Sequence, residues 1–273
     1  MSRLLPSATY IGPVALRVQD LERSQNFYSS MLGLTVLPSE TNRATMGDSN
    51  GTPLIHLTDD AHASPKPPGT TGVFHFAILV PDRVTLGQSA FRLGKAGGHL
   101  DGAADHLVSE ALYLSDPDGI GIEIYRDRPR DEWSWRRDEV EMATLALDFQ
   151  SLVEEYNASG LETSTRLSSA TMGHIHLSVP DLTAAEEFYC GKLGFEKVSR
   201  YPQAIFVSAG RYHHHIGLNT WARRPPPPSS AGMTWFTIVL PTQEDVESAA
   251  AAVGSDGPDF TDPFGNGIRL VAG

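Results

Sequence analysis

Four short segments of alternating or continuous apolar residues recur along the chain, and each leads into an amphipathic stretch. They read PVALRV, HFAILV, HIHLSV and WFTIVL, beginning at residues 13, 75, 174 and 235. Alternation predicts a half-buried strand, whereas apolar residues spaced three or four apart predict a helix. Each segment passes through Pro-Asp or a similar pair into the predicted helix and returns through further short strands. The pattern predicts four β-α-β-β-β units at residues 10–60, 72–126, 172–221 and 232–272, and hence an α+β fold with curved mixed sheets.

Two stretches of the chain are repeated. GPVALRVQDLERSQNFYSSMLGL (12–34) aligns without gaps with GHIHLSVPDLTAAEEFYCGKLGF (173–195), so that an Asp-Leu, a Phe-Tyr and a Leu-Gly pair coincide. SDPDGIGIEIY (115–125) aligns with TDPFGNGIRLV (261–271), where Arg269 replaces Glu123. Self-similarity of this kind indicates one supersecondary unit used several times.

The repeats divide the chain into two halves. Residues 1–126 hold two units, residues 172–273 hold the other two, and residues 127–171 form a connector that we expect to be helical. The run RRPPPPSS (223–230) cannot continue a helix or occupy a central strand, so it is interpreted as a stiff spacer between the third and fourth units.

Composition restricts the partners. The chain of 273 residues carries a formal charge of -12 and no block of Lys and Arg, which argues against nucleic acid. No apolar run approaches the roughly 20 residues of a membrane span, and the N-terminal apolar run is too short for a signal peptide, so a cytoplasmic protein is expected. With Cys190 as the single cysteine, a thiolate cage is excluded. A bound metal must therefore be held by His, Asp or Glu.

These features together resemble the vicinal oxygen chelate superfamily, which includes glyoxalases, bleomycin resistance proteins and extradiol dioxygenases. The likeness rests on the four units, the repeated Asp-Leu, Phe-Tyr and Leu-Gly pairs, and the final-strand pattern Asp-Pro-x-Gly-x-x-x-Glu at 116–123. It covers nearly the whole chain apart from the connector. It implies two paired curved-sheet cups, with metal ligands on the first and last strands of the units. The fold alone does not choose an activity.

The resemblance places a metal site on the second and third units. Residues at the first-strand position are, in order, Pro13, His75, His174 and Trp235, and residues at or near the last-strand position are His56, Glu123, Gly217 and Arg269. The implied ligands are His75, His174 and Glu123, with a glycine at the fourth corner. Two imidazoles and one carboxylate suit iron(II), leave positions for a bidentate substrate and dioxygen, and would also accept manganese(II).

This ligand set requires an unusual pairing of the units. In the familiar extradiol enzymes all three ligands come from the last two units, but Trp235 and Arg269 occupy those places here. We therefore expect the second unit to pack against the third and the first against the fourth, leaving the other cup without metal.

The stretch DHLVSEALYLSDPDGIGIE (105–123) resembles the ring-cleavage dioxygenase signature. The residues that match in order and spacing are His106, Leu112, Tyr113, Asp116, Pro117, Gly119 and Glu123, and Ala104 is a minor departure. The resemblance implies that His106 and Tyr113 hydrogen-bond the substrate or dioxygen.

A histidine of near-neutral pKa is also needed as acid and base. The run YHHHIGLNTW supplies His213, His214 and His215, and strand alternation puts His213 and His215 on the face of Gly217. We assign His215 as the acid/base and His213 and His176 to substrate binding. Two alternatives stay open: His176 could replace His174 as the ligand, and another histidine of the run could be the acid/base.

The function that follows is an iron(II)-dependent extradiol dioxygenase acting on a catechol-type substrate, most similar to the bacterial catechol-2,3-dioxygenase group and so part of aromatic catabolism. Its partners would be a small aromatic diol and dioxygen, with homo-oligomerisation left open and no nucleic acid or membrane partner. The alternatives are a glyoxalase-like metalloenzyme and a non-catalytic small-molecule-binding protein of the same fold.

Overall fold

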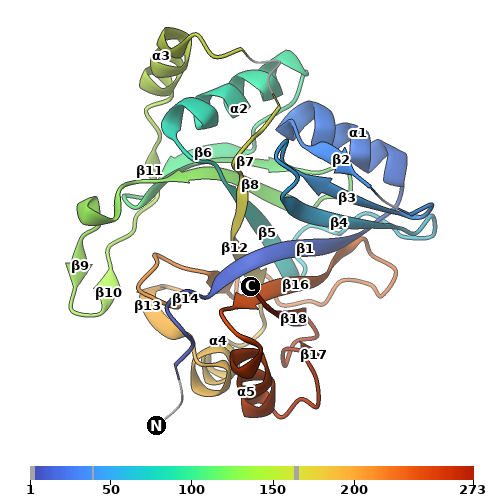
Figure 1. Cartoon of the computed structure of the whole chain (residues 1–273), viewed down its shortest axis with the longest axis vertical. Coiled ribbons are helices and arrows are strands. Elements are labelled where there is room, and N and C mark those ends of the chain that lie inside the picture. Colours follow the sequence, from blue (N-terminus) through green and yellow to red (C-terminus); the bar gives the residue numbers. More distant parts are fainter. Residues whose placement is uncertain (1–3, 39, 163–165) are drawn as a thin grey trace.

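Two curved β-sheets form the frame of the molecule, each built from one unit of either half of the chain, and the larger sheet gains one strand from the connector (Figure 1). The computed structural model describes residues 4–38, 40–162 and 166–273. The seven-stranded sheet contains, in spatial order, β17 (Asp259–Thr261), β18 (Gly267–Ala272), β16 (Gly232–Leu240), β1 (Tyr10–Val18), β4 (Pro53–Asp59), β3 (Arg43–Gly47) and β2 (Thr35–Leu37). The nine-stranded sheet contains β11 (Leu145–Ala146), β6 (Gly102–Asp105), β7 (Ser109–Ser115), β8 (Gly121–Asp127), β5 (Gly72–Leu79), β12 (Thr171–Ser178), β15 (Ile216–Asn219), β14 (Ala204–Ser208) and β13 (Glu196–Tyr201).

This topology confirms the expected pairing of the units. Strand β5 of the second unit runs antiparallel to β12 of the third, and β1 of the first unit runs antiparallel to β16 of the fourth. Each sheet is therefore continuous across a seam between the two halves of the chain.

The helices begin where the sequence provides caps. Each unit has one principal helix: α1 (Leu21–Leu32), α2 (Arg83–Lys95), α4 (Leu182–Glu186) continuing as the π-helix η2 (Glu187–Leu193), and α5 (Gln243–Val253). The carboxylates of Asp20 and Asp181 accept hydrogen bonds from backbone N–H groups in the first turns of α1 and α4, which is the usual stabilisation of a helix N-terminus. Gly33 ends α1 in the left-handed conformation, with φ of 74°, which glycine adopts without a steric penalty.

A buried tyrosine on each of two helices ties successive units together. Tyr28 of α1 donates a 2.9 Å hydrogen bond to Asp116, in the turn before β8, and Tyr189 of η2 donates one of 2.9 Å to Asp262, in the turn before β18. The repeated Phe-Tyr and Asp-Pro motifs thus bind the first unit to the second and the third to the fourth, while the sheets join the other pairs.

The connector is helical only in part, which corrects the expectation for residues 127–171. Its described residues contain the 3-10 turn η1 (Arg130–Glu132), a ribbon of β9 (Trp135–Arg136) and β10 (Glu139–Val140), strand β11 and helix α3 (Phe149–Ser159). Residues 163–165 lie outside the described residues. Trp133 is buried with Val140 in a small hydrophobic cluster, so apolar anchoring rather than helical periodicity organises this segment.

The seven-stranded sheet lacks the predicted ligands. Trp235 and Arg269 occupy the positions that correspond to His75 and Glu123, and they form a cation–π pair. The guanidinium carbon of Arg269 lies 4.2 Å from the centre of the Trp235 ring.

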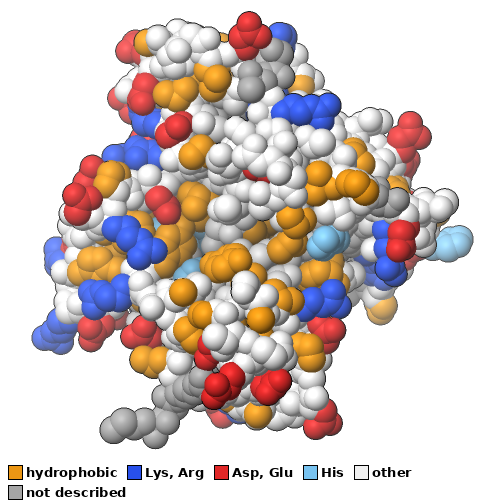
Figure 2. Space-filling model, in the orientation of Figure 1, with side chains coloured by type: hydrophobic (Ala, Val, Ile, Leu, Met, Phe, Trp, Pro, Cys, Tyr) orange, Lys and Arg blue, Asp and Glu red, His pale blue; other side chains and the backbone are white. Residues whose placement is uncertain are grey.

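Figure 2 shows that charged side chains gather toward the rim of the face in view, while apolar side chains concentrate near its middle. Among the helices in the described ranges, none is both long and apolar enough to cross a membrane.

Candidate metal centre

Three neighbouring strands of the nine-stranded sheet bring the predicted ligands together. His75 lies in β5, Glu123 in β8 and His174 in β12. Strand β5 runs between the other two, and its Ala77 is the register partner of both Glu123 and His174. Residues at equal register, and those two positions apart on one strand, point to the same face. The strand register therefore aims all three side chains at one point.

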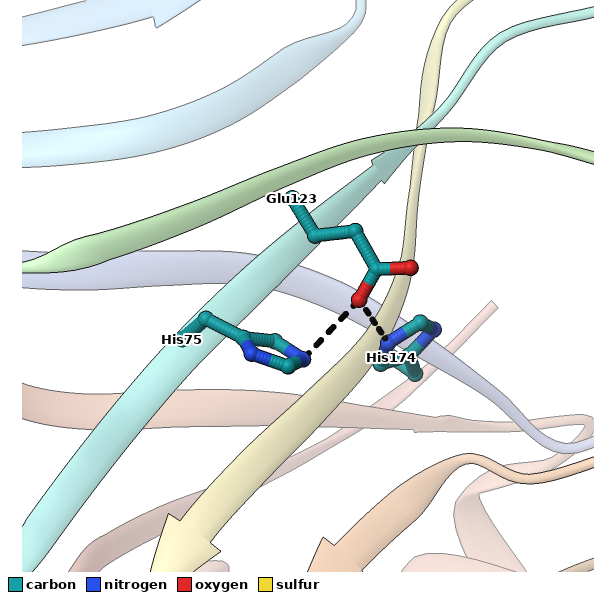
Figure 3. A group of neighbouring side chains, drawn as sticks. All are labelled: His75, Glu123 and His174. Atoms are coloured by element: carbon teal, nitrogen blue, oxygen red, sulfur yellow. Dashed lines mark hydrogen bonds and ion pairs between the residues drawn. The ribbon is translucent and has the colours of Figure 1, made fainter. Parts of the chain in front are cut away.

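The three ligand atoms converge tightly. The Oε2 atom of Glu123 lies 3.0 Å from Nε2 of His75 and 3.0 Å from Nε2 of His174, and Figure 3 shows the side chains pointing toward one another. One ligand atom from each residue fits within 4.8 Å of the others, and all three residues are buried. The group could hold a metal ion.

The chemistry of the donors fits a divalent transition metal. Nε2 of His75 is buried and makes no hydrogen bond with any described residue, although the Glu123 carboxylate is close. An unsatisfied buried nitrogen is costly unless something binds it. Imidazole and carboxylate donors suit a borderline metal such as iron(II) or manganese(II).

The protonation states of the donors also suit a metal. Burial by itself would raise the pKa of Glu123, but the adjacent imidazoles of His174 and His75 hold that pKa well below its usual range. Burial lowers the pKa of His174 to about 4. At neutral pH the carboxylate is ionised and the His174 imidazole is neutral, which are the forms that bind metal.

Two residues of the signature form a hydrogen-bonded chain beside the triad. Tyr113 of β7 is the cross-strand partner of Glu123. Nδ1 of His106 lies 2.6 Å from the carbonyl oxygen of Ala143, and because a carbonyl only accepts, this nitrogen carries the proton. Nε2 of a neutral His106 then accepts from the hydroxyl of Tyr113, 2.6 Å away. Burial and the nearby Glu123 raise the pKa of Tyr113 well above its usual range, so the phenol keeps its proton.

His174, not His176, stands in the triad. The amide oxygen of Asn219 accepts from the hydroxyl of Ser178, which orients the amide so that its nitrogen donates to Nε2 of His176 at 3.0 Å. That nitrogen of His176 is therefore already engaged. The side chain nevertheless lines the same cavity as His174, where the prediction places it as a substrate-binding residue.

Gly217 lies at the expected fourth corner. It is the register partner of His176 on β15, and a Cβ added to it would lie 3.0 Å from the His176 ring. Among the described residues, no fourth His, Cys, Asp or Glu joins the group. The ring of His176 therefore takes the space that a fourth ligand would need.

The placement of His215 does not favour its assignment as the acid/base. Strand β15 begins only at Ile216, so the three histidines precede it and strand alternation does not apply to them. Nδ1 of His215 accepts from the backbone N–H of Ala209, and the residue is not among those that line the cavity beside the triad. Burial lowers the pKa of His215 to about 3 and also lowers the pKa of His214 well below its usual range, so the position of the side chain, and not its pKa, distinguishes the two histidines.

His213 is also absent from the lining of this cavity, which does not favour its assignment to substrate binding. Its Nε2 lies 2.8 Å from Oδ1 of Asp127, and its Nδ1 lies 2.8 Å from Nδ1 of His214. The side chain is fully buried. His213 thus links a carboxylate to the neighbouring histidine.

His214 is the histidine of the run that lines the cavity, and the sequence reasoning did not single it out. Its ring centroid lies 4.1 Å from that of His174. When His213 donates its Nε2–H to Asp127, a neutral His213 accepts from His214 through the two Nδ1 atoms. This tautomer leaves Nε2 of His214 free to accept a proton. The run itself was the available signal, but the backbone bend that selects one member is not visible in the sequence.

A cavity of about 530 Å³ adjoins the triad. It is lined by Phe74, His75, His106, Val108, Ser109, Tyr113, Glu123, Met142, Ala143, Thr144, His174, His176, Tyr201, Pro202, Ala204, Phe206, His214 and Trp221. Phe74 and Trp221 were not anticipated, and their rings stand edge to face with centroids 5.1 Å apart. They are 44% and 53% exposed, so this aromatic pair borders the cavity where it meets solvent.

Comparison with protein families and curated proteins gives one consistent result. Residues 10–124 and 171–270 match the model of the Glyoxalase/Bleomycin resistance protein/Dioxygenase superfamily. The chain is 46% identical over 256 residues to a protein of Bacillus subtilis (strain 168) named catechol-2,3-dioxygenase, with 90% of this chain and 87% of that protein covered.

Solved structures agree on the fold. A candidate dioxygenase from Bacillus subtilis subsp. subtilis str. 168 superposes with a TM-score of 0.67 at 14% identity, covering 100% of this chain and 86% of that one. Glyoxalase I from Zea mays gives a TM-score of 0.55 at 18% identity, covering 97% of this chain and 92% of that one. At these identities the likeness shows the fold alone.

Proposed function

The chain belongs to the Glyoxalase/Bleomycin resistance protein/Dioxygenase superfamily, and from this premise we propose that it is an extradiol dioxygenase that cleaves a catechol-type substrate at a mononuclear iron(II) site. The reaction inserts both atoms of dioxygen and breaks one ring carbon–carbon bond beside the diol, so it needs no further reductant. The 46% identical catechol-2,3-dioxygenase supports a dioxygenase-like enzyme.

One observation carries this proposal. The converging ligands His75, Glu123 and His174 line the same cavity as the hydrogen-bonded pair His106 and Tyr113. A metal-binding group and polar side chains that can orient a diol therefore face one enclosed space. Bound iron(II) would supply adjacent coordination positions for the diol oxygens and for dioxygen.

The residues around the triad have distinct roles in this proposal. Tyr113 donates a hydrogen bond to His106, so the lone pairs of its oxygen are free to accept a hydrogen bond from a substrate hydroxyl. His214 takes the acid/base role in place of His215, because it lines the cavity and its tautomer is set from behind by His213. His176 contacts the substrate ring from the side of Gly217.

The fourth corner favours this function over a glyoxalase-like one. A glyoxalase-type site is expected to have a fourth protein ligand, and here Gly217 offers none while the ring of His176 fills the adjacent space. The buried carboxylate also disfavours a metal-free binding protein, since an ionised Glu123 with no cation beside it would be costly.

The test is ring cleavage by the metal-loaded protein. The chain is reconstituted with iron(II) without oxygen, catechol is added in air, and the yellow ring-opened semialdehyde is followed by absorbance. We expect iron-dependent colour in the wild type. Glu123→Gln should lower kcat by at least about 10³-fold and weaken iron binding, because it removes a charged ligand.

Glu22→Gln is the matched control, since Glu22 is an exposed residue of α1, and it should behave as the wild type. Stoichiometric iron binding without colour from any catechol would refute the dioxygenase proposal. Absence of metal binding by the folded wild type would refute the metal site itself.

A further inference from the structure

The cavity beside the triad has a long apolar wall. His214, next to the triad, has its ring centroid 5.0 Å from that of Phe206, which in turn lies 5.8 Å from that of Tyr201. The hydroxyl of Tyr201 donates to the backbone carbonyl of Met142. Val108, Met142 and Phe206 line the cavity on this side. The wall therefore runs from the triad to the connector.

This wall is held in place from behind. Val108 belongs to a small hydrophobic cluster with Trp133, Val140, Val198 and Tyr212, and Met142 and Phe206 pack against it. Trp133 donates a 3.0 Å hydrogen bond from its indole nitrogen to the carbonyl of Arg128. A wall supported by a packed cluster keeps its shape when the cavity is filled.

The cavity wall offers no Lys or Arg side chain to an anionic substituent. Among the described residues that line it, none is Lys or Arg, and Glu123 is the single carboxylate. A second cavity of about 430 Å³ shares Phe74, His75, Tyr113 and Trp221 with the first and includes Lys66. Lys66 does not line the first cavity, and its ammonium already donates to the carbonyl of Thr70 at 3.4 Å.

The size of the cavity exceeds what a bare catechol requires. A volume of about 530 Å³ lies within the roughly 300–1,000 Å³ of sites that enclose drug-sized ligands. A single benzene ring with two hydroxyls would leave the wall of Val108, Met142 and Phe206 facing water. Removing that apolar surface from water favours a substrate with an apolar extension.

We propose that the substrate is an uncharged catechol bearing an apolar alkyl or aryl substituent, which lies against Val108, Met142, Tyr201 and Phe206. The inference rests on the proposed ring-cleavage function and refines its substrate class. A substituent carboxylate is disfavoured because it would lose its hydration against an apolar wall without gaining a Lys or Arg partner there.

The test measures kcat/KM of the iron-loaded chain in air for catechol, butylcatechol and protocatechuate, whose substituent is a carboxylate. Both ring isomers of butylcatechol are assayed, and the isomer with the higher kcat/KM is used in the comparison. We expect kcat/KM for butylcatechol to exceed that for catechol by about tenfold or more, since even one methylene in a hydrophobic pocket is worth roughly that factor. We expect kcat/KM for protocatechuate to be at least about 100-fold below that for butylcatechol.

A charge placed on the wall tests the location of the substituent. Met142→Lys should reduce the preference for butylcatechol over protocatechuate by at least about tenfold. Leu145→Lys is the matched control, because Leu145 follows closely in the connector, is 51% exposed and does not line the cavity. Its preference should equal that of the wild type.

The outcomes separate the two proposals. If the metal-loaded wild type cleaves none of the three diols, the ring-cleavage function fails and this inference falls with it. If catechol is cleaved as efficiently as butylcatechol, or protocatechuate is preferred, the substrate class is wrong while the function stands. A protocatechuate preference that is lost in Lys66→Met would assign the substituent to the second cavity, and would equally overturn the inference.

Discussion

The start of strand β15 decides which histidine of the run His213–His215 faces the cavity. Because the strand starts at Ile216, the backbone before it is irregular and the alternation of side chains does not extend back to the histidines. His214 turns toward His174, while His213 and His215 bond to Asp127 and to the backbone of Ala209.

A pair of substitutions tests this difference. His214→Gln should lower kcat for ring cleavage by about 10²–10⁴-fold, the usual contribution of a general acid or base. His215→Gln removes only buried hydrogen bonds outside the cavity, and it should leave kcat within about tenfold of the wild type while lowering stability by about 1–3 kcal/mol.

Iron content and circular dichroism of both variants establish that each one is folded and metal-loaded. The opposite ranking, with His215→Gln inactive and His214→Gln active, would restore His215 as the acid/base.

At the scale of elements, the turn before β8 is attached to helix α1 by a buried carboxyl group. Asp116 accepts from the hydroxyl of Tyr28 at 2.9 Å and from the backbone N–H groups of Asp118 and Ile120 at 2.9 and 2.8 Å. Burial raises the pKa of Asp116 from 3.8 to about 6, although these hydrogen bonds oppose the rise. The contact between α1 and the turn before β8, which the hydrogen bond from Tyr28 to Asp116 makes, is therefore sensitive to pH.

The direction of this sensitivity follows from linkage. The folded pKa of Asp116 lies above the unfolded one, so the folded state binds the proton more tightly. Its contribution to stability is full below about pH 4 and is lost as the pH rises through about 6. Between these values the free energy of unfolding of the wild type, relative to Asp116→Asn, should fall by on the order of 2–3 kcal/mol.

Urea unfolding at several pH values measures this difference. Tyr28→Phe removes a hydrogen bond that favours the ionised carboxyl group, so in that variant the fall should extend to higher pH. Parallel stability curves for the wild type and Asp116→Asn would show that Asp116 does not titrate in this range.

At the scale of the whole molecule, the candidate metal centre spans the seam between the two halves of the chain. His75 and Glu123 come from the first half and His174 from the second, across the antiparallel pair β5 and β12. A metal bound there would hold the seam closed, so metal binding and overall stability should be coupled.

Metal loading should therefore raise the melting temperature. At a free metal concentration of about 100 times Kd the gain is about 2.7 kcal/mol, which corresponds to roughly 5–10 °C for a chain of this size. Calorimetry with manganese(II), before and after chelation by EDTA, measures the shift. Glu123→Gln should lose most of it and Glu22→Gln should keep it. An equal melting temperature with and without stoichiometrically bound metal would place the bound ion away from the seam.

The sequence by itself determined the units and their order, and with the family resemblance it indicated the candidate ligands. Strand periodicity and the repeated motifs are local, so the four β-α-β-β-β units could be read directly, and Trp235 and Arg269, at positions where the family resemblance implies ligands, predicted which units pair. The same alignment selected His75, Glu123 and His174, which the structure brings within 4.8 Å of one another.

Only the tertiary structure decided which side chains share the cavity with this group. The backbone before β15 selects His214, the amide of Asn219 engages His176, and the connector supplies Met142 and Ala143. These choices depend on loop conformation and on contacts between residues distant in the chain, and neither produces a periodic pattern of residues in the sequence. The connector likewise resisted prediction, because Trp133 is buried by packing against Val108 and Tyr212 from other units rather than by any pattern in its own sequence.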